Sequence, residues 1–97
     1  MKKKRARIEI ISDILLFIKK AGNAKPTNIL YKANLSVPLL KSYLNTLIKD
    51  GLIGCTSNGK KTIYNITKKG NKFIEILKEV NSMTQIIEIY GSRRKIL

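Results

Sequence analysis

The chain has 97 residues, with 20 lysines and arginines against 6 acidic residues, a net charge of +14, one cysteine and no histidine or tryptophan. This composition excludes a zinc tetrad, a histidine-based catalytic couple and an imidazole proton shuttle, so we expect neither enzymatic activity nor a cofactor. It favours one small domain with a polyanionic partner, and nucleic acid is preferred over a membrane because the chain lacks tryptophan anchors and a lipidation signal.

The basic charge is concentrated in the middle of the chain. Between Ile14 and Ile74, eleven lysines stand against one acid, Asp50. The basic start of the chain precedes an apolar run, but acidic residues interrupt this run and no small-residue cleavage site follows. We therefore expect a cytoplasmic protein without a secretion signal.

Apolar residues at a helical period predict a first helix over about residues 5–21. Gly22 is expected to end it. Two interpretations of the basic residues before this helix stay open, namely an arm that enters a DNA minor groove and a solubilising tail. The predicted buried stripe of the helix consists of Ile8, Ile11, Ile14, Leu15, Phe17 and Ile18.

Two further helices are predicted over Pro26–Ala33 and residues 37–50, with the spacing of a helix-turn-helix. Pro26 suits a first helical position, and Asn34 suits the left-handed conformation that ends the first of these helices. Ser36 is a good N-cap for the second helix, and Gly51 is expected to close it. The steep turn between the helices makes the second one a candidate recognition helix.

The candidate recognition helix has one apolar stripe, and the opposite face carries no carboxylate before Asp50. Ammonium, hydroxyl and amide groups on such a face suit phosphates and base edges in a major groove, whereas the alternative is an ordinary solvated face. The predicted buried stripe is Leu40, Leu44, Leu47 and Ile48. The predicted DNA contacts of the helix-turn-helix are Lys25, Thr27, Asn28, Ser36, Lys41, Ser42, Asn45 and Lys49.

A β-hairpin is predicted next, from extended runs over residues 52–56 and 61–67 that flank an Asn-Gly pair. Lys60 and Lys61 lie at its tip, where we expect further DNA contacts. Three helices followed by a hairpin with a basic tip is the order of a winged helix, in which the hairpin is the wing. Cys55 is interpreted as a small buried residue in a reducing compartment, with an intermolecular disulfide as the alternative.

Thr67 is the predicted N-cap of a final helix that begins with Lys68 and Lys69. Cations are mildly disfavoured at a helix N-terminus, so we expect a DNA phosphate to bind there, with solvated lysines as the alternative. Residues 1–67 thus form the predicted winged helix-turn-helix domain, which binds DNA.

Residues 68–91 form a predicted coiled-coil dimerisation helix, ended by Gly91 and followed by a basic tail over residues 92–97. A second apolar stripe, beginning with Ile74 and Leu77, is expected to pack on the same chain. The alternative to dimerisation is that the helix folds back along the first helix. The predicted dimer seam is Phe73, Ile76, Val80, Met83, Ile87 and Tyr90, spaced alternately by three and four residues.

Two segments resemble a known family. The run from Tyr31 to Ser36, which contains Ala-Asn-Leu-Ser, and the run from Tyr64 to Gly70, which contains Thr-Lys-Lys-Gly, resemble the small basic archaeal DNA-binding proteins of the 10a type and, more broadly, archaeal winged-helix regulators. The resemblance implies a mainly α fold with a small β-hairpin, and a homodimer held by an antiparallel coiled coil of the last helix. It implies binding of double-stranded DNA by a nucleoid-associated protein, in chromatin organisation or in transcriptional regulation.

Two other functions remain open at this stage. A winged helix can bind an acidic protein partner instead of DNA. Binding of RNA is less favoured because the two phenylalanines and four tyrosines are scattered and form no stacking platform.

Overall fold

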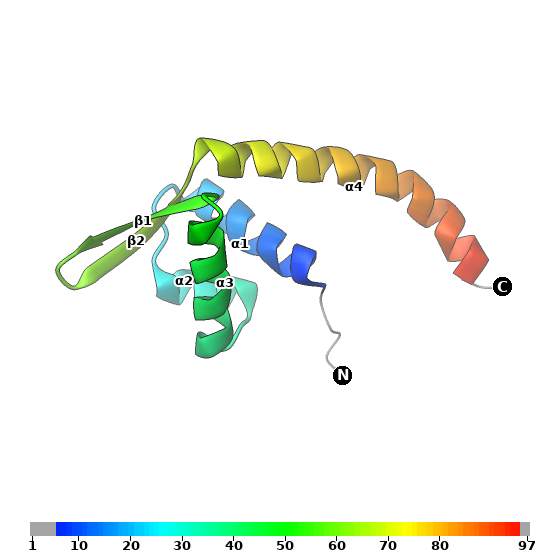
Figure 1. Cartoon of the computed structure of the whole chain (residues 1–97). Helices are drawn as coiled ribbons and strands as arrows, with labels where there is room; N and C mark the ends of the chain where they lie inside the picture. Colours follow the sequence, from blue (N-terminus) through cyan, green and yellow to red (C-terminus); the bar gives the residue numbers. More distant parts are fainter. Residues whose placement is uncertain (1–5, 96–97) are drawn as a thin grey trace.

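The computed structural model describes residues 6–95, and in the last helix it describes side chains as far as Met83, Asn81 excepted. Three helices come first, α1 (Arg7–Ala21), α2 (Pro26–Ala33) and α3 (Val37–Lys49). The strands β1 (Ile53–Asn58) and β2 (Lys61–Ile66) then form an antiparallel hairpin, and α4 (Lys68–Lys95) follows it (Figure 1). This order confirms the predicted mainly α fold with a small hairpin.

Helix α1 supplies one wall of the core. It begins after Ala6, whose N–H donates to the Glu9 carboxylate at 2.7 Å. The predicted burial of Ile8 is wrong, because this side chain is 46% exposed and Ile10 is buried in its place. The buried row runs along Ile10, Ile14 and Ile18 at intervals of four residues, and Ile8 lies on its flank.

The predicted helix-turn-helix is confirmed. Pro26 occupies the first turn of α2, and Asn34 ends this helix in the left-handed conformation, with φ 55° and ψ 55°. The hydroxyl of Ser36 caps α3 by accepting a hydrogen bond from the N–H of Leu39 at 3.4 Å. Gly51 follows the end of α3 with φ 77°.

The buried face of α3 differs from the predicted stripe at one position. Leu40, Leu44 and Leu47 are buried as predicted, but Ile48 is 37% exposed and Tyr43 is buried instead. Tyr43 is covered from α1, because the guanidinium carbon of Arg7 lies 5.9 Å from the centre of its ring. The buried face is therefore rotated toward Tyr43.

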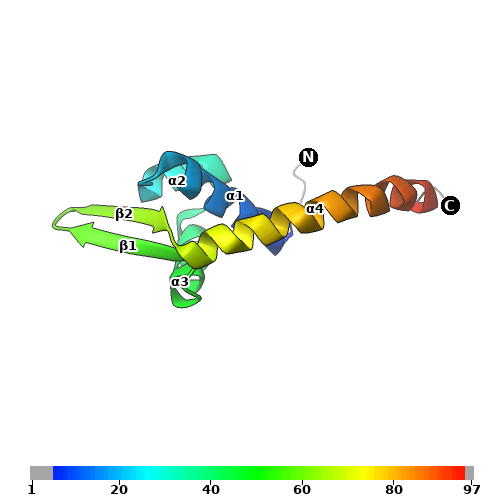
Figure 2. The same ribbon diagram turned by 90° about the horizontal axis from the view of Figure 1, so that it is seen from above.

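The hairpin is longer than predicted at its tip. Asn58 pairs with Lys61, so the connecting loop is Gly59 and Lys60 alone. Gly59 has φ 63°, which suits glycine at the first position of a two-residue hairpin loop. The hairpin projects from the helices (Figures 1 and 2), so only its base can be covered by the core. Cys55 is exposed, and its predicted burial is wrong.

The first turns of α4 belong to the core, and the rest of the helix extends beyond the body of the protein (Figure 2). Ile74 is buried, and Phe73 packs against the core from a half-buried position. Farther along α4, the apolar side chains Ile76, Val80 and Met83 are 48%, 45% and 66% exposed. The side chains of Ile87 and Tyr90 lie outside the described part of the chain.

Gly91 does not end α4, so this prediction is wrong. The helix continues through Gly91 to Lys95. A glycine inside a helix costs only about 1 kcal/mol relative to alanine. Within residues 6–95, no helix combines the length and the apolar character needed to cross a membrane.

Candidate nucleic-acid interface

The outer face of α3 presents polar and basic side chains to solvent. Lys41, Ser42, Asn45 and Lys49 are all exposed, as predicted. The helix itself contains no acidic residue, and its first acid neighbour is the C-cap residue Asp50. An anion can therefore approach this face without meeting a carboxylate of the helix.

A second basic surface lies between the start of α2 and the wing. A groove of about 280 Å³ is lined by Lys25, Thr27 and neighbouring residues of α2 on one side and by Lys60 and Lys61 on the other. Three ammonium groups and two hydroxyls, of Thr27 and Thr62, thus border one hollow beside the N-terminus of α2, where free N–H groups favour anions. The groove can accommodate a phosphate. We use the name wing groove for this hollow and for Lys25, Thr27, Lys60 and Lys61, which line it.

An isolated backbone pairing holds the two sides of the wing groove together. Ala24 and Tyr64 exchange two hydrogen bonds, each 2.8 Å long, so the linker before α2 is attached to β2. The Tyr64 side chain is half-buried, and its burial, with a smaller contribution from Cys55 on the opposite strand, raises the pKa of its hydroxyl. A phenol is already neutral at physiological pH with its ordinary pKa of about 10, so the raised pKa of Tyr64 leaves it neutral.

Lys69 has a partner within the fold. Its ammonium group donates to the backbone carbonyl of Asp50, at the end of α3, with a distance of 2.7 Å. Thr67 donates its hydroxyl proton to the carbonyl of Gly51 at 2.6 Å and its N–H to the carbonyl of Leu52 at 3.3 Å. Thr67 and Lys69 thus bind the three successive carbonyls of residues 50–52, an arrangement that we name the α3–α4 clasp.

The clasp changes the interpretation of the start of α4. Thr67 is its N-cap as predicted, because the hydroxyl also accepts a hydrogen bond from the N–H of Gly70 at 3.0 Å. A DNA phosphate and solvent were the two places expected for Lys69. Its ammonium instead contacts the Asp50 carbonyl, where it stabilises the negative end of the α3 dipole, and its phosphate contact stays a prediction. Lys68 is exposed, and its predicted phosphate contact stays a prediction.

A family model for the winged helix-turn-helix matches residues 4–85. The chain belongs to this family. A search of curated proteins gave no match.

Several solved structures resemble the protein over most of its length. Sso10a-2, described as a DNA-binding protein from Sulfolobus solfataricus, is 25% identical, with a TM-score of 0.77 over 95% of this chain and 93% of that one. AF1382 from Archaeoglobus fulgidus is 19% identical, with a TM-score of 0.68 over 78% of this chain and 88% of that one. MepR, a transcription regulator from Staphylococcus aureus, is 16% identical, with a TM-score of 0.70 over 80% of this chain and 61% of that one. The last two likenesses concern the fold alone.

The winged helix does not bring all the predicted contacts together. The wing groove joins Lys25, Thr27, Lys60 and Lys61, but Asn28 lines a different hollow with Phe17, Tyr31 and Lys32. The Ser36 hydroxyl is engaged as the cap of α3. No local pattern predicts the pairing between Ala24 and Tyr64, because it joins residues forty positions apart.

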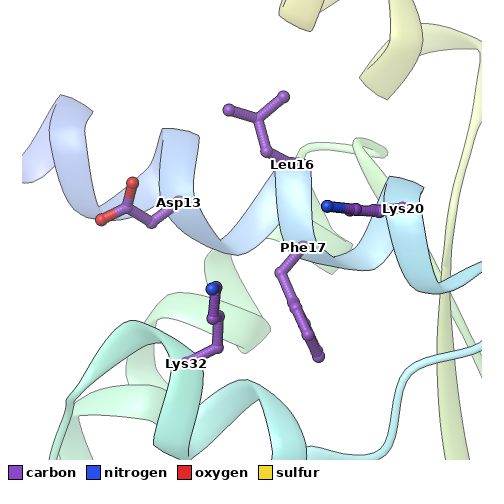
Figure 3. Close-up of a pocket in the computed structure, with 5 residues that line it drawn as sticks. All are labelled: Asp13, Leu16, Phe17, Lys20 and Lys32. Atoms are coloured by element: carbon purple, nitrogen blue, oxygen red, sulfur yellow. The ribbon is translucent and has the colours of Figure 1, made fainter.

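A larger open hollow of about 520 Å³ lies between α1 and α2 (Figure 3). Its lining comprises Asp13, Leu16, Phe17, Lys20 and Lys32, and none of these is a predicted DNA contact. Phe17 points toward α2 while Leu16 points away from it (Figure 3). This hollow is thus separate in its residues from the wing groove.

Proposed function

We propose that the protein is a homodimeric winged helix that binds double-stranded DNA and acts in chromatin organisation or transcriptional regulation. In this proposal α3 enters the major groove, where Lys41, Ser42 and Asn45 meet base edges and Lys49 meets the backbone. The wing groove and Lys68 bind phosphates. The observation that carries the proposal is the wing groove, which places three ammonium groups around one hollow beside a helix N-terminus.

The homodimer rests on the exposed apolar side of α4. Ile76, Val80 and Met83 are large apolar side chains, each about half exposed or more, on a helix that leaves the body of its own chain. They follow the seven-residue repeat of a coiled coil, which the sequence continues with Ile87 and Tyr90. We propose that residues 68–91 form an antiparallel coiled coil between two chains, with the first turns also packed in the core. In this arrangement Phe73 contributes both to the core of its own chain and to the coiled coil.

The salt dependence of DNA binding tests the proposed function. Each phosphate neutralised by a lysine should contribute a log–log slope of about −0.9. With six to ten such contacts, affinity for a duplex should fall about 10³- to 10⁵-fold between roughly 50 and 200 mM salt. The measurement is a titration of a labelled duplex by fluorescence anisotropy at several salt concentrations. Absence of binding at low salt would contradict the proposal and favour an acidic protein partner.

Two sets of substitutions should separate positioning from base reading. Replacement of Lys60 and Lys61 by alanine should weaken binding to all duplexes alike, because ammonium groups of the wing contact phosphates. Asn45→Ala should instead change the preferred sequences, since an amide can pair with an adenine edge and is worth about 1–3 kcal/mol there.

The measurement is selection from random duplexes followed by sequencing, with the unmodified protein as reference. A sharp selected motif would identify a regulator, and a flat profile an architectural protein. If Asn45→Ala leaves the selected profile unchanged, Asn45 does not read bases.

A further inference from the structure

The first turn of α3 is apolar and exposed, which is unusual beside a basic face. Val37 and Leu39 are 53% and 43% exposed, and Pro38 between them is also exposed. The core does not require these side chains, because α3 packs inward through Leu40 and the residues that follow it on that side. Residues 37–39 therefore present hydrocarbon at the tip of the helix.

This tip is continuous with the polar face of α3. Val37 and Pro38 precede Lys41 and Ser42 by four residues each, so they lie one turn above them along the helix. Few donors are available at the tip, since proline has no N–H and the N–H of Leu39 is bonded to Ser36. The tip cannot recognise a base through hydrogen bonds from its side chains.

One chemical group in the major groove suits such a surface. Among the four bases of DNA, only thymine carries a methyl group there, and apolar side chains recognise this methyl by contact. The flanking ammonium of Lys41 provides the charge complementarity that an approach to DNA requires. We propose that residues 37–39 pack against the C5 methyl groups of thymine, so that the protein prefers thymine-containing DNA to the same duplex with uracil. This inference rests on the proposed DNA binding.

The test compares two duplexes that differ only in these methyl groups. We would use an alternating AT duplex of about 30 base pairs, roughly three helical turns, and its AU deoxynucleotide counterpart. Removal of the methyl groups should weaken binding about fourfold for each methyl that the tip contacts. Both duplexes carry the same phosphates, so the salt slope of binding should be equal for the two.

A double variant assigns the preference to the tip. Val37→Ser with Leu39→Ser removes the apolar surface and leaves the charge unchanged, so its affinities for the two duplexes should become nearly equal. Leu16→Ser, which removes an exposed apolar side chain of α1, is the matched control and should keep the full preference. Circular dichroism and thermal melting of each variant establish that it is folded.

Three results would overturn the inference in distinguishable ways. Equal affinity of the unmodified protein for the two duplexes would exclude methyl recognition while DNA binding itself stands. If the folded double variant keeps the preference for thymine, the preference comes from DNA shape and not from residues 37–39. Failure to bind either duplex would remove the proposed function as well.

Discussion

Val80→Glu should convert the proposed dimer to a folded monomer. In the proposed seam this carboxylate would be buried without a partner, which costs about 3–5 kcal/mol. In a monomer it would lie on an exposed part of α4, where Val80 is already 45% exposed, and would cost little. Analytical ultracentrifugation of the variant and the unmodified protein measures the change.

Loss of the dimer should also weaken DNA binding. Two linked domains on one duplex gain an effective concentration that raises affinity about 10²- to 10⁴-fold, and a monomer loses this gain. The matched control is Ser82→Glu, which adds the same charge to an exposed position of α4 outside the seam. An unmodified protein that is monomeric at roughly tens of micromolar, well above the dissociation constant of a useful dimer, would contradict the two-chain arrangement.

Gly70→Ala should destabilise the fold, although alanine is the better helix former by about 1 kcal/mol. Gly70 is buried at the start of α4, and a methyl group there would collide with the Leu52 carbonyl oxygen and come within 2.7 Å of the Ile66 side chain. Overpacking of this kind costs about 1–3 kcal/mol or more. We expect the melting temperature to fall by roughly 10 °C or more, as measured by circular dichroism.

Gly54→Ala is the control for this substitution. Its added methyl group would meet mainly the amide oxygen of Asn65, at 2.6 Å, and a side-chain end of this kind can move aside. We expect a change in stability within about 0.5 kcal/mol. Equal melting temperatures for the two variants would contradict this prediction. They would mean that Leu52 and Ile66, at the base of the wing, move to accommodate the methyl group of Gly70→Ala.

Local signals in the sequence predicted the helices and the turn between α2 and α3. Ser36, Asn34 and Pro26 act through their own backbone and nearest neighbours, so their positions can be inferred without knowledge of the rest of the fold. The exposed basic side chains of α3 were predicted for a similar reason, since a helix with one apolar stripe has a defined opposite face.

The errors arose where distant parts of the chain decide the outcome. Whether Ile8 or Ile10 is buried depends on how α1 meets its neighbours. Tyr43 is part of the core, and Arg7 of α1 lies over its ring. Cys55 is exposed because the wing projects beyond the core, which its residue type does not reveal. Lys69 contacts a carbonyl nineteen residues away, so no local pattern could have predicted this contact.

The α3–α4 clasp has a consequence for the wing as a structural unit. The clasp joins the residues on either side of the hairpin, so residues 53–66 form a loop that is closed at its neck. The neck therefore ties the end of α3 directly to the start of α4, at a point outside the hairpin. We expect that the hairpin beyond this neck can be shortened, extended or exchanged without reorienting α3 or α4. Such changes should be made in pairs of residues, which keeps the alternation of the strands. In the proposed function, the length of the wing could therefore vary to suit a DNA backbone while the clasp stays unchanged.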